Sequence, residues 1–277
     1  MDKTKSVGII GYGNMGQAIA ERIKDEYTVN VFDKDKNKIS SLNNASTDIE
    51  SLVKKSEVII LSIKPQDFDE LLAEIKPFAE NKFFITIAAG ITTKFMKSRL
   101  GDNARVVRVM PNMPAQIGQG VTVIFKGEES LNTGANPAWQ LAYDIFSNLG
   151  SVLAVDKEDM INMATAISGS GPAFFCQYMK ERKNAPAMRD EFIKLLTESA
   201  VGLGFDRKEA EFLSERAVDG IISMLVERNL SCADVIKMVA SKGGTTQAGL
   251  DVLNSGGTLE EAVKSAYKRA GELGQRS

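Results

Sequence analysis

Glycines near the start of the chain have a spacing that could hold a phosphate group. The segment GYGNMG places Gly11, Gly13 and Gly16 as G-x-G-x-x-G, directly after an apolar run at residues 7–10. In this pattern the first glycine allows a tight turn, the second lets the backbone approach a pyrophosphate, and the third lets a helix pack closely on a strand. The first turn of that helix offers free N–H groups to the phosphates. The residues expected to hold a dinucleotide pyrophosphate are Gly11, Gly13, Asn14, Met15 and Gly16.

An aspartate ends the next predicted strand, at the distance from the glycines that dinucleotide sites require. The Asp33 carboxylate could accept hydrogen bonds from a ribose 2′-hydroxyl, which favours NADH. Lys34, Lys36 and Lys38 could instead neutralise the 2′-phosphate of NADPH, although such a lysine run is more typical of a solvated helix start. The sequence therefore leaves the choice between NADH and NADPH open.

Two later strand ends also carry candidate binding residues. Ligands of open parallel sheets bind in the crevice at the carboxyl ends of the strands. The segment LSIKPQD ends one strand in a Lys-Pro pair, for which an ordinary loop is the alternative interpretation, and TIAAGIT ends another in small residues that let a ring or ribose approach. The residues expected to line this crevice are Ser62, Ile63, Lys64, Pro65, Ala88, Ala89 and Gly90.

Two segments further along combine small, polar and proline residues in apolar surroundings. Pro111 and Pro114 flank an asparagine in VRVMPNMPA and would stiffen that loop. Residues 168–171 of ATAISGSGPAFF interrupt a helical pattern with glycines and serines. This stretch must bring the backbone close either to a neighbouring helix or to a substrate.

The segment ASKGGTTQAG predicts an anion site. Gly243 and Gly244 precede Thr245 and Thr246, which open a helix. Flexible backbone N–H groups beside a helix N-terminus form a site of suitable size for a carboxylate. The threonine hydroxyls either cap the helix or reach the ligand.

The chain contains no histidine, which excludes a Ser-His-Asp triad, a histidine-ligated metal and a histidine general acid. Its net charge of −2 gives no basis for a nucleic-acid partner or an anionic membrane surface. Cys176 and Cys232 are the two cysteines, each alone in an apolar or helical context, and we expect both in the core of a reduced protein. The start, MDKTKS, predicts no targeting segment, so we expect a cytoplasmic protein.

The elements that must position these residues fall into two parts. Short β-rich runs alternate with helical patterns up to residue 155, which predicts parallel βα units in an α/β, doubly wound Rossmann sheet. The predicted strands are 6–10, 28–32, 57–62, 82–87, 104–109, 121–125 and 151–155. The predicted helices between them are 14–24, 35–43, 67–78, 92–98 and 137–148.

From residue 157 onward apolar residues recur at helical spacing and no strand pattern is present. Asp206 with Glu209 and Thr258 with Glu261 have the spacing of capping boxes. The polar segment 180–191 predicts a solvated turn or helix junction. We therefore expect a dinucleotide-binding domain at 1–156 and an all-α domain at 157–277.

The segments GYGNMGQAIA, IKPQ, IAAGIT, RVMPNMPA, SGSGPAF and GGTTQAGL occur in this order over nearly the whole chain. In this respect the chain closely resembles the pyrroline-5-carboxylate reductases, and the MPN-x-PA, SGSGPA and GGTT blocks are the specific part of the likeness. The resemblance implies reduction of the cyclic imine 1-pyrroline-5-carboxylate to proline by NADPH or NADH. It also implies a helical C-terminal domain that forms a homodimer, alone or within a larger homo-oligomer.

The resemblance assigns roles to individual residues. Backbone N–H groups of Gly243, Gly244 and Thr245 would bind the substrate carboxylate, and the Thr246 hydroxyl would orient or protonate the ring nitrogen. Residues 63–65 and 88–90 would line the nicotinamide and ribose. The residues implied for the pocket wall are Met110, Asn112 and Ser168.

The chain departs from the family pattern near this pocket. It has Lys242 where the family usually has proline, Met113 where it has threonine, and Ser231-Cys232 where it has a His-Pro pair. The stretch 172–204 is also longer than usual. Two alternatives therefore stay open: a paralogue that reduces another cyclic imine or a keto acid, and a nucleotide-binding regulator without catalysis.

Overall fold

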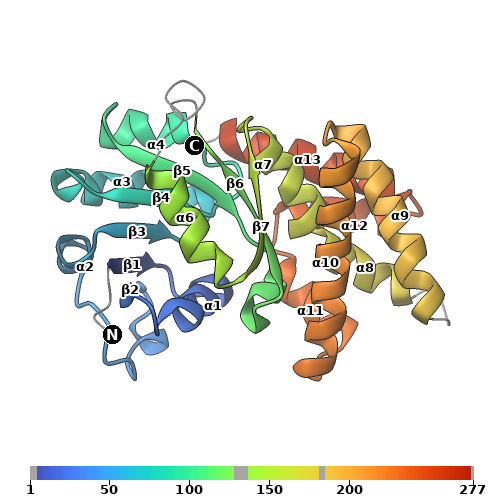
Figure 1. Ribbon diagram of the computed structural model, residues 1–277, viewed down its shortest axis with the longest axis horizontal. Helices are drawn as coiled ribbons and strands as arrows, with labels where there is room; N and C mark the ends of the chain where they lie inside the picture. Colours follow the sequence, from blue (N-terminus) through green and yellow to red (C-terminus); the bar gives the residue numbers. More distant parts are fainter. Residues whose placement is uncertain (1–4, 128–136, 181–184, 276–277) are drawn as a thin grey trace.

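The computed structural model describes residues 5–127, 137–180 and 185–275, and these form a sheet half and a helical half side by side (Figure 1). Within these residues, seven strands make one sheet in the order β2-β1-β3-β4-β5-β6-β7. All the predicted strands are confirmed, the first two with the predicted bounds. The strands are β1 Ser6–Ile10, β2 Thr28–Phe32, β3 Val58–Leu61, β4 Phe83–Thr86, β5 Arg105–Met110, β6 Gly120–Phe125 and β7 Gly150–Val155.

Helices cover both faces of the sheet, which explains why its central strands are apolar on both sides. Every residue of β3 is buried. Val58 and Ile60 pack toward one cluster with Ile19 of α1, while Ile59 and Leu61 join a second cluster. Such continuous apolar strands are typical of doubly wound sheets. The covering helices are α1 Asn14–Ile23, α2 Ile49–Lys55, α3 Phe68–Ile75, α4 Thr93–Leu100 and α6 Pro137–Ser147.

One pair of strands departs from the predicted parallel arrangement. β5 and β6 are antiparallel, with Val109 opposite Ile124. Between them lies only the short 3-10 turn η4, Met113–Ile117, which is too short for the crossover that parallel neighbours need. The strands before this pair are parallel to one another, and β6 and β7 are parallel again. The prediction of parallel βα units is therefore wrong at β5–β6.

The helix predicted at 35–43 is also wrong, because the chain there forms only the 3-10 turn η1, Lys36–Lys38. The segment that follows must return to run beside β2. The Val31 N–H donates to the Asn44 carbonyl at 3.0 Å, and the Ser46 N–H donates to the Val31 carbonyl at 2.7 Å. The helix in this region is α2, which was not predicted and begins at an Asp48 cap.

The second half of the chain is helical, as predicted. Both predicted capping boxes are present, and a third at Ser231 and Asp234 was not predicted. Of the predicted solvated junction at 180–191, residues 181–184 lie outside the described residues, and the chain is helical from Ala185. The elements are α7 Met160–Ala164, the π-helical turn η5 Thr165–Gly169, α8 Gly171–Lys180, α9 Ala185–Leu203, α10 Arg207–Glu227, α11 Cys232–Val239, α12 Thr245–Asn254 and α13 Leu259–Gln275.

An apolar cluster joins the two halves. Val121 and Val123 of β6 and Val155 of β7 pack in the same cluster as Phe174 of α8 and Leu213 of α10. The change from strands to helices does fall after β7. The division into domains at 156 nevertheless stays a prediction, because buried side chains from both sides of it share this core.

In the described part of the chain, no helix combines the length and apolar character needed to cross a bilayer. The same residues contain no group of three or more His, Cys, Asp or Glu side chains placed to hold a metal ion. The cytoplasmic location stays a prediction.

Candidate active site

The glycine-rich loop after β1 is fixed by close packing. Gly11 has φ +97°, in the left-handed region, and a side chain there would collide with the Ser62 carbonyl. A side chain at Gly16 would collide with the Gly11 carbonyl, so α1 can pack on the loop only because both residues are glycine. A Cβ at Gly13 would instead meet nothing within 4 Å. The backbone at Gly13 is therefore open to a ligand, as the motif predicts.

A cavity of about 760 Å³ opens beside this loop. Among the predicted cofactor residues, those that line it are Gly11, Gly13, Asp33, Ser62, Ile63 and Lys64. The three lysines after Asp33 line it too, as do Thr47, Asp48, Gln66, Asp67 and Glu70, which were not predicted. The predicted residues outside this lining are Asn14, Met15, Gly16, Pro65, Ala88, Ala89 and Gly90.

The Asp33 carboxylate is buried and already hydrogen-bonded within the protein. It accepts the Tyr12 N–H at 2.7 Å and the Asp35 N–H at 2.8 Å, and Lys38 Nζ lies 3.3 Å from Oδ2. Burial acts to raise the pKa of Asp33, but the backbone hydrogen bonds and Lys38 outweigh it and hold the pKa below its ordinary value. The carboxylate thus ties the glycine-rich loop to the end of β2.

The cavity has the features that a dinucleotide needs. The N-cap of α1, Gly13, makes no side-chain cap, so the first N–H groups of that helix are free for phosphate. Lys36 donates to the Thr47 carbonyl at 2.8 Å, and Lys34 lies 3.6 Å from Asp67. These lysines bring positive charge to the part of the cavity beside the buried Asp33, which Asp48 and Asp67 also line.

The loop after β4, residues 87–92, packs against the end of the chain's last helix. Gly90 has φ +81°, and a Cβ there would lie 2.5 Å from the Gly274 nitrogen of α13. Ala88, in the same loop, is buried. The predicted segment 88–90 is therefore small because a helix crosses it closely.

The π-helical turn η5 and the proline-flanked loop after β5 meet at a buried asparagine. Asn112 Nδ2 donates to the Ser168 carbonyl at 3.2 Å, and its Oδ1 accepts the Val121 N–H at 2.8 Å. The Ser168 hydroxyl donates to the Ala164 carbonyl at 3.1 Å, and Met110 is buried beside Gly169. The three residues predicted for the pocket wall thus lie together, and Ser168 and Asn112 are held by backbone.

Thr246 meets a residue that was not predicted, Ser170. Their hydroxyl oxygens lie 3.0 Å apart, and both side chains are buried. Ser170 also donates to the Thr165 carbonyl at 3.0 Å. Because a serine hydroxyl has one proton, Thr246 is the donor in the pair. The Thr246 oxygen therefore keeps lone pairs for a ligand.

The loop that precedes α12 presents backbone to its surroundings. Gly243 has φ +70°, Gly244 is the helix N-cap, and α12 has no side-chain cap. The threonines therefore do not cap the helix, which was one of the two interpretations. The Gly244 N–H already donates to the Ser241 carbonyl at 2.9 Å. The N–H groups of Thr245, Thr246 and Gln247, in the first turn, are the ones without a helical partner.

Helix α13 contacts both the loop before α12 and the loop after β4, which the sequence did not indicate. Arg269 Nε donates to the Gly243 carbonyl at 2.8 Å, and Ser265 donates to the Ala248 carbonyl at 3.1 Å. The Tyr267 hydroxyl donates to Asp159 at 2.5 Å, which raises the pKa of Tyr267 to about 12. In Figure 1, α13 runs from the helical half back to the sheet. One helix thus contacts both glycine-containing loops, at 90 and at 243.

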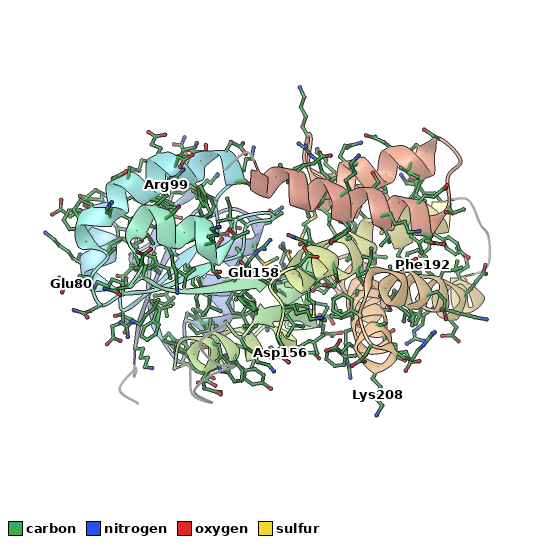
Figure 2. The ribbon with its side chains drawn as sticks, turned by 90° about the horizontal axis from the view of Figure 1, so that it is seen from above. Glu80, Arg99, Asp156, Glu158, Phe192 and Lys208 are labelled. Carbon is green, nitrogen blue, oxygen red and sulfur yellow. The ribbon has the colours of Figure 1, made fainter. Side chains whose placement is uncertain are left out.

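An ion pair between a buried arginine and a partly exposed glutamate supports the loop at 87–92. Arg108 of β5 donates to Asn162 at 2.6 Å and lies 3.7 Å from Glu158, which in turn accepts the Thr93 N–H at 2.7 Å. Burial lowers the pKa of the Arg108 guanidinium, and Glu158 and Asp159 oppose that shift. Figure 2 shows Glu158 between the sheet half and the helices that carry Phe192 and Lys208. The pair holds the start of α4, where the loop ends.

Two family models match the chain. The model described as pyrroline-5-carboxylate reductase dimerisation matches residues 184–273, and the one described as NADP oxidoreductase coenzyme F420-dependent matches residues 6–90. Among solved structures, a pyrroline-5-carboxylate reductase from Coxiella burnetii is 28% identical, with a TM-score of 0.62 and 98% of each chain covered. A Plasmodium falciparum pyrroline carboxylate reductase with NADP bound is 26% identical, with a TM-score of 0.60, covering 98% of this chain and 99% of that one.

Two bacterial relatives match over nearly their full length. The pyrroline-5-carboxylate reductase of Staphylococcus aureus strain COL is 33% identical over 279 residues, which cover 95% of this chain and 96% of the relative. The Staphylococcus epidermidis protein of the same name is 32% identical over 282 residues, covering 96% and 97%. The chain therefore belongs to the pyrroline-5-carboxylate reductase family.

Proposed function

We propose that the chain reduces 1-pyrroline-5-carboxylate to L-proline, with hydride taken from NADPH or NADH. The observation that carries the proposal is the pairing of Thr246 with Ser170 beside the uncapped start of α12, in a chain of this family. A hydroxyl and free N–H groups at one helix start suit a substrate with a ring nitrogen and a carboxylate.

The cofactor would occupy the cavity beside the glycine-rich loop. Bound dihydronicotinamide supplies the hydride. The pyrophosphate would lie on the N–H groups of Asn14 and Met15, above Gly13, with Gly11 and Gly16 shaping the turn. Asp33 would face the adenosine ribose. The nicotinamide end would follow the strand ends at 62–65 and 88–90.

The substrate carboxylate would bind at the loop before α12. The Thr245 N–H offers a hydrogen-bond donor at the positive end of a helix, whereas the predicted Gly244 N–H already donates to the Ser241 carbonyl. Arg269 holds this loop through the Gly243 carbonyl. The wall beyond the ring would be formed by Met110, Asn112 and Ser168.

Thr246 would orient the ring nitrogen instead of donating a proton to it. A cyclic imine that is protonated near neutral pH is already an electrophilic iminium, so hydride can add to its carbon without a strong acid. The hydrogen bonds run from Thr246 to Ser170 and on to the Thr165 carbonyl. The Thr246 oxygen can then accept the iminium N–H, and this polarised chain would stabilise the cation. No histidine is required.

Purified protein should oxidise NADPH or NADH when 1-pyrroline-5-carboxylate is added, followed by the loss of reduced-cofactor absorbance. Thr246→Val should lower kcat by about 100-fold, because orientation and electrostatic stabilisation are lost together. Thr246→Ser keeps the hydroxyl and should keep most of the activity. Absence of turnover with either cofactor, in protein that binds NADPH, would contradict the proposal.

The protein would work as a cytoplasmic homo-oligomer whose minimal unit is a dimer. The match of residues 184–273 to a dimerisation model supports association through the helical half. Light scattering at several protein concentrations should give the mass of a dimer or a multiple of it. A mass equal to the 30.1 kDa chain at all concentrations would contradict this part.

A further inference from the structure

The two cysteines of the chain are 56 positions apart in the sequence and are neighbours in the fold. Cys176 is in α8 and Cys232 opens α11, and these two helices pack with Cα atoms within 8 Å. Cys232 packs against the apolar cluster that contains Cys176, and its thiol is near enough to affect the pKa of Cys176. The expectation that both cysteines lie in the core is confirmed for Cys176, whereas Cys232 is only partly buried.

The two thiols differ in their access to solvent. Cys176 is 0% exposed and belongs to the apolar cluster that joins the two halves. Cys232 is partly exposed and packs on the edge of that cluster. Burial raises the pKa of the Cys176 thiol, and the neighbouring Cys232 raises it further. In the single chain Cys232 is thus the more accessible thiol, and Cys176 is shielded.

We propose that Cys176 and Cys232 form a reversible intramolecular disulfide when the protein meets a peroxide. The Cys232 sulfur attacks one peroxide oxygen, the O–O bond breaks, and water leaves, so that Cys232 becomes a sulfenic acid. The Cys176 sulfur then attacks the Cys232 sulfur and displaces a second water. Two thiols and one hydrogen peroxide give one disulfide and two waters. A dithiol reductant reverses the reaction.

The disulfide would act on the two segments that meet at Thr246. Helix α8, with Cys176, starts directly after Ser170, and α11, with Cys232, ends just before the loop that leads to Gly243. A disulfide has an S–S length of about 2.05 Å, shorter than a thiol contact, so the two helices must approach. Oxidation should therefore shift the hydroxyl of Ser170 relative to that of Thr246.

Titration of the folded protein with hydrogen peroxide tests the proposal without reference to its activity. We expect the free thiols, counted after unfolding in a thiol reagent, to fall from two to none. Mass spectrometry should show a loss of about 2 Da and one peptide pair that contains both cysteines. Dithiothreitol should restore both thiols. Two thiols that persist, a single over-oxidised Cys232, or disulfides only between chains would each overturn the proposal.

Two variants separate the roles of the sulfurs. In Cys176→Ser, peroxide should leave Cys232 as a sulfenic acid that a dimedone probe traps. In Cys232→Ser, peroxide should leave the buried Cys176 unmodified over the same time, and rapid loss of that thiol would contradict the assigned order.

The effect of oxidation on catalysis depends on the proposed function. If the protein reduces the imine, oxidation should lower its activity and dithiothreitol should restore it; disulfide formation with unchanged activity would overturn only the link to the active site.

Discussion

Two glycine-containing loops each precede a helix in this protein, and different contacts hold each loop in place. In the loop before α1, Gly11 and Gly16 touch neighbouring carbonyls so closely that no side chain fits. In the loop before α12, the nearest atom to a Cβ at Gly243 is Arg269 Nη2 at 3.7 Å. The first loop is fixed by backbone packing at Gly11 and Gly16 and is open at Gly13. The second is exposed and uncrowded at Gly243, where Arg269 holds it, and is packed closely only at Gly244, where a Cβ would collide with Ser241 Oγ.

This difference matches what each loop would bind. A pyrophosphate is common to many dinucleotides, so a loop fixed in advance suits it and lowers the ordering cost on binding. A small imino acid must enter and leave at each turnover, which a loop held by side chains permits. Each loop should therefore respond to mutation according to what holds it.

Gly11→Ala should give the largest effect. The new methyl group would collide with the Ser62 carbonyl at a backbone φ of +97°, so we expect a loss of about 3 kcal/mol in the free energy of unfolding. The Kd for NADPH should rise at least about tenfold. Urea unfolding and calorimetric titration measure these changes. Gly13→Ala is the matched control, since nothing lies within 4 Å of its Cβ, and equal destabilisation by both variants would break the comparison.

Arg269→Ala should act on the second loop alone. Loss of the hydrogen bond to the Gly243 carbonyl frees the loop, and we expect the KM for the imine to rise about tenfold while the Kd for NADPH stays unchanged. Steady-state kinetics with each substrate varied gives both numbers. Lys264→Ala, an exposed change on the same helix, should leave the KM unaltered. An unchanged KM in Arg269→Ala would show that packing alone holds this loop.

Gly243→Ala should lower the free energy of unfolding less than Gly11→Ala does, because there is space for a methyl group at Gly243. Only the left-handed φ of +70° opposes it, which amounts to about 1 kcal/mol of unfolding free energy. Gly202→Ala, at a helix position in α9 with open space, should instead stabilise the protein by about 0.5 kcal/mol. Urea unfolding compares the two variants, and a loss of 3 kcal/mol at Gly243 would not fit a loosely held loop.

Asp33→Asn should give the smallest effect on binding and a distinctive dependence on pH. Because the pKa of Asp33 is below its ordinary value in the folded protein, its ionised form stabilises the fold above about pH 4. That contribution disappears as pH falls through the lowered pKa. The difference in stability between wild type and Asp33→Asn should therefore be constant near neutrality and shrink in acid. A difference that grows in acid would contradict the assigned role of Asp33 in holding the first loop.

Most of the sheet could be predicted, because strands such as VIIL combine β-branched residues with burial on both faces. The helix at 35–43 could not be excluded from sequence, since its loss depends on Ser46 and Asn44 pairing with Val31 of β2. The short η4 turn, which makes β5 and β6 antiparallel, gave no signal of strand direction.

In the candidate site, too, the sequence predicted the residues with a local motif and missed those placed by tertiary contacts. The glycine-rich motif predicted Gly11 and Gly13 well, because backbone approach requires glycine whatever surrounds it. Ser170 and Ser168 stand in the same SGSG segment, and only the π-helical turn decides that Ser170 is the one facing Thr246. Arg269 lies in an ordinary amphipathic helix, so nothing in its neighbours indicated the contact with Gly243. Site residues that depend on tertiary packing are the ones that sequence patterns miss.

The apolar cluster shared by β6, β7, α8 and α10 affects both thermal unfolding and the relative motion of the two halves. Rotating the sheet half away from the helical half would expose Val123, Phe174 and Leu213 to water together. We therefore expect calorimetry to record one cooperative heat-absorption peak instead of two. Opening and closing during turnover should then be confined to loops such as the one before α12, while the two halves stay together as a single rigid frame.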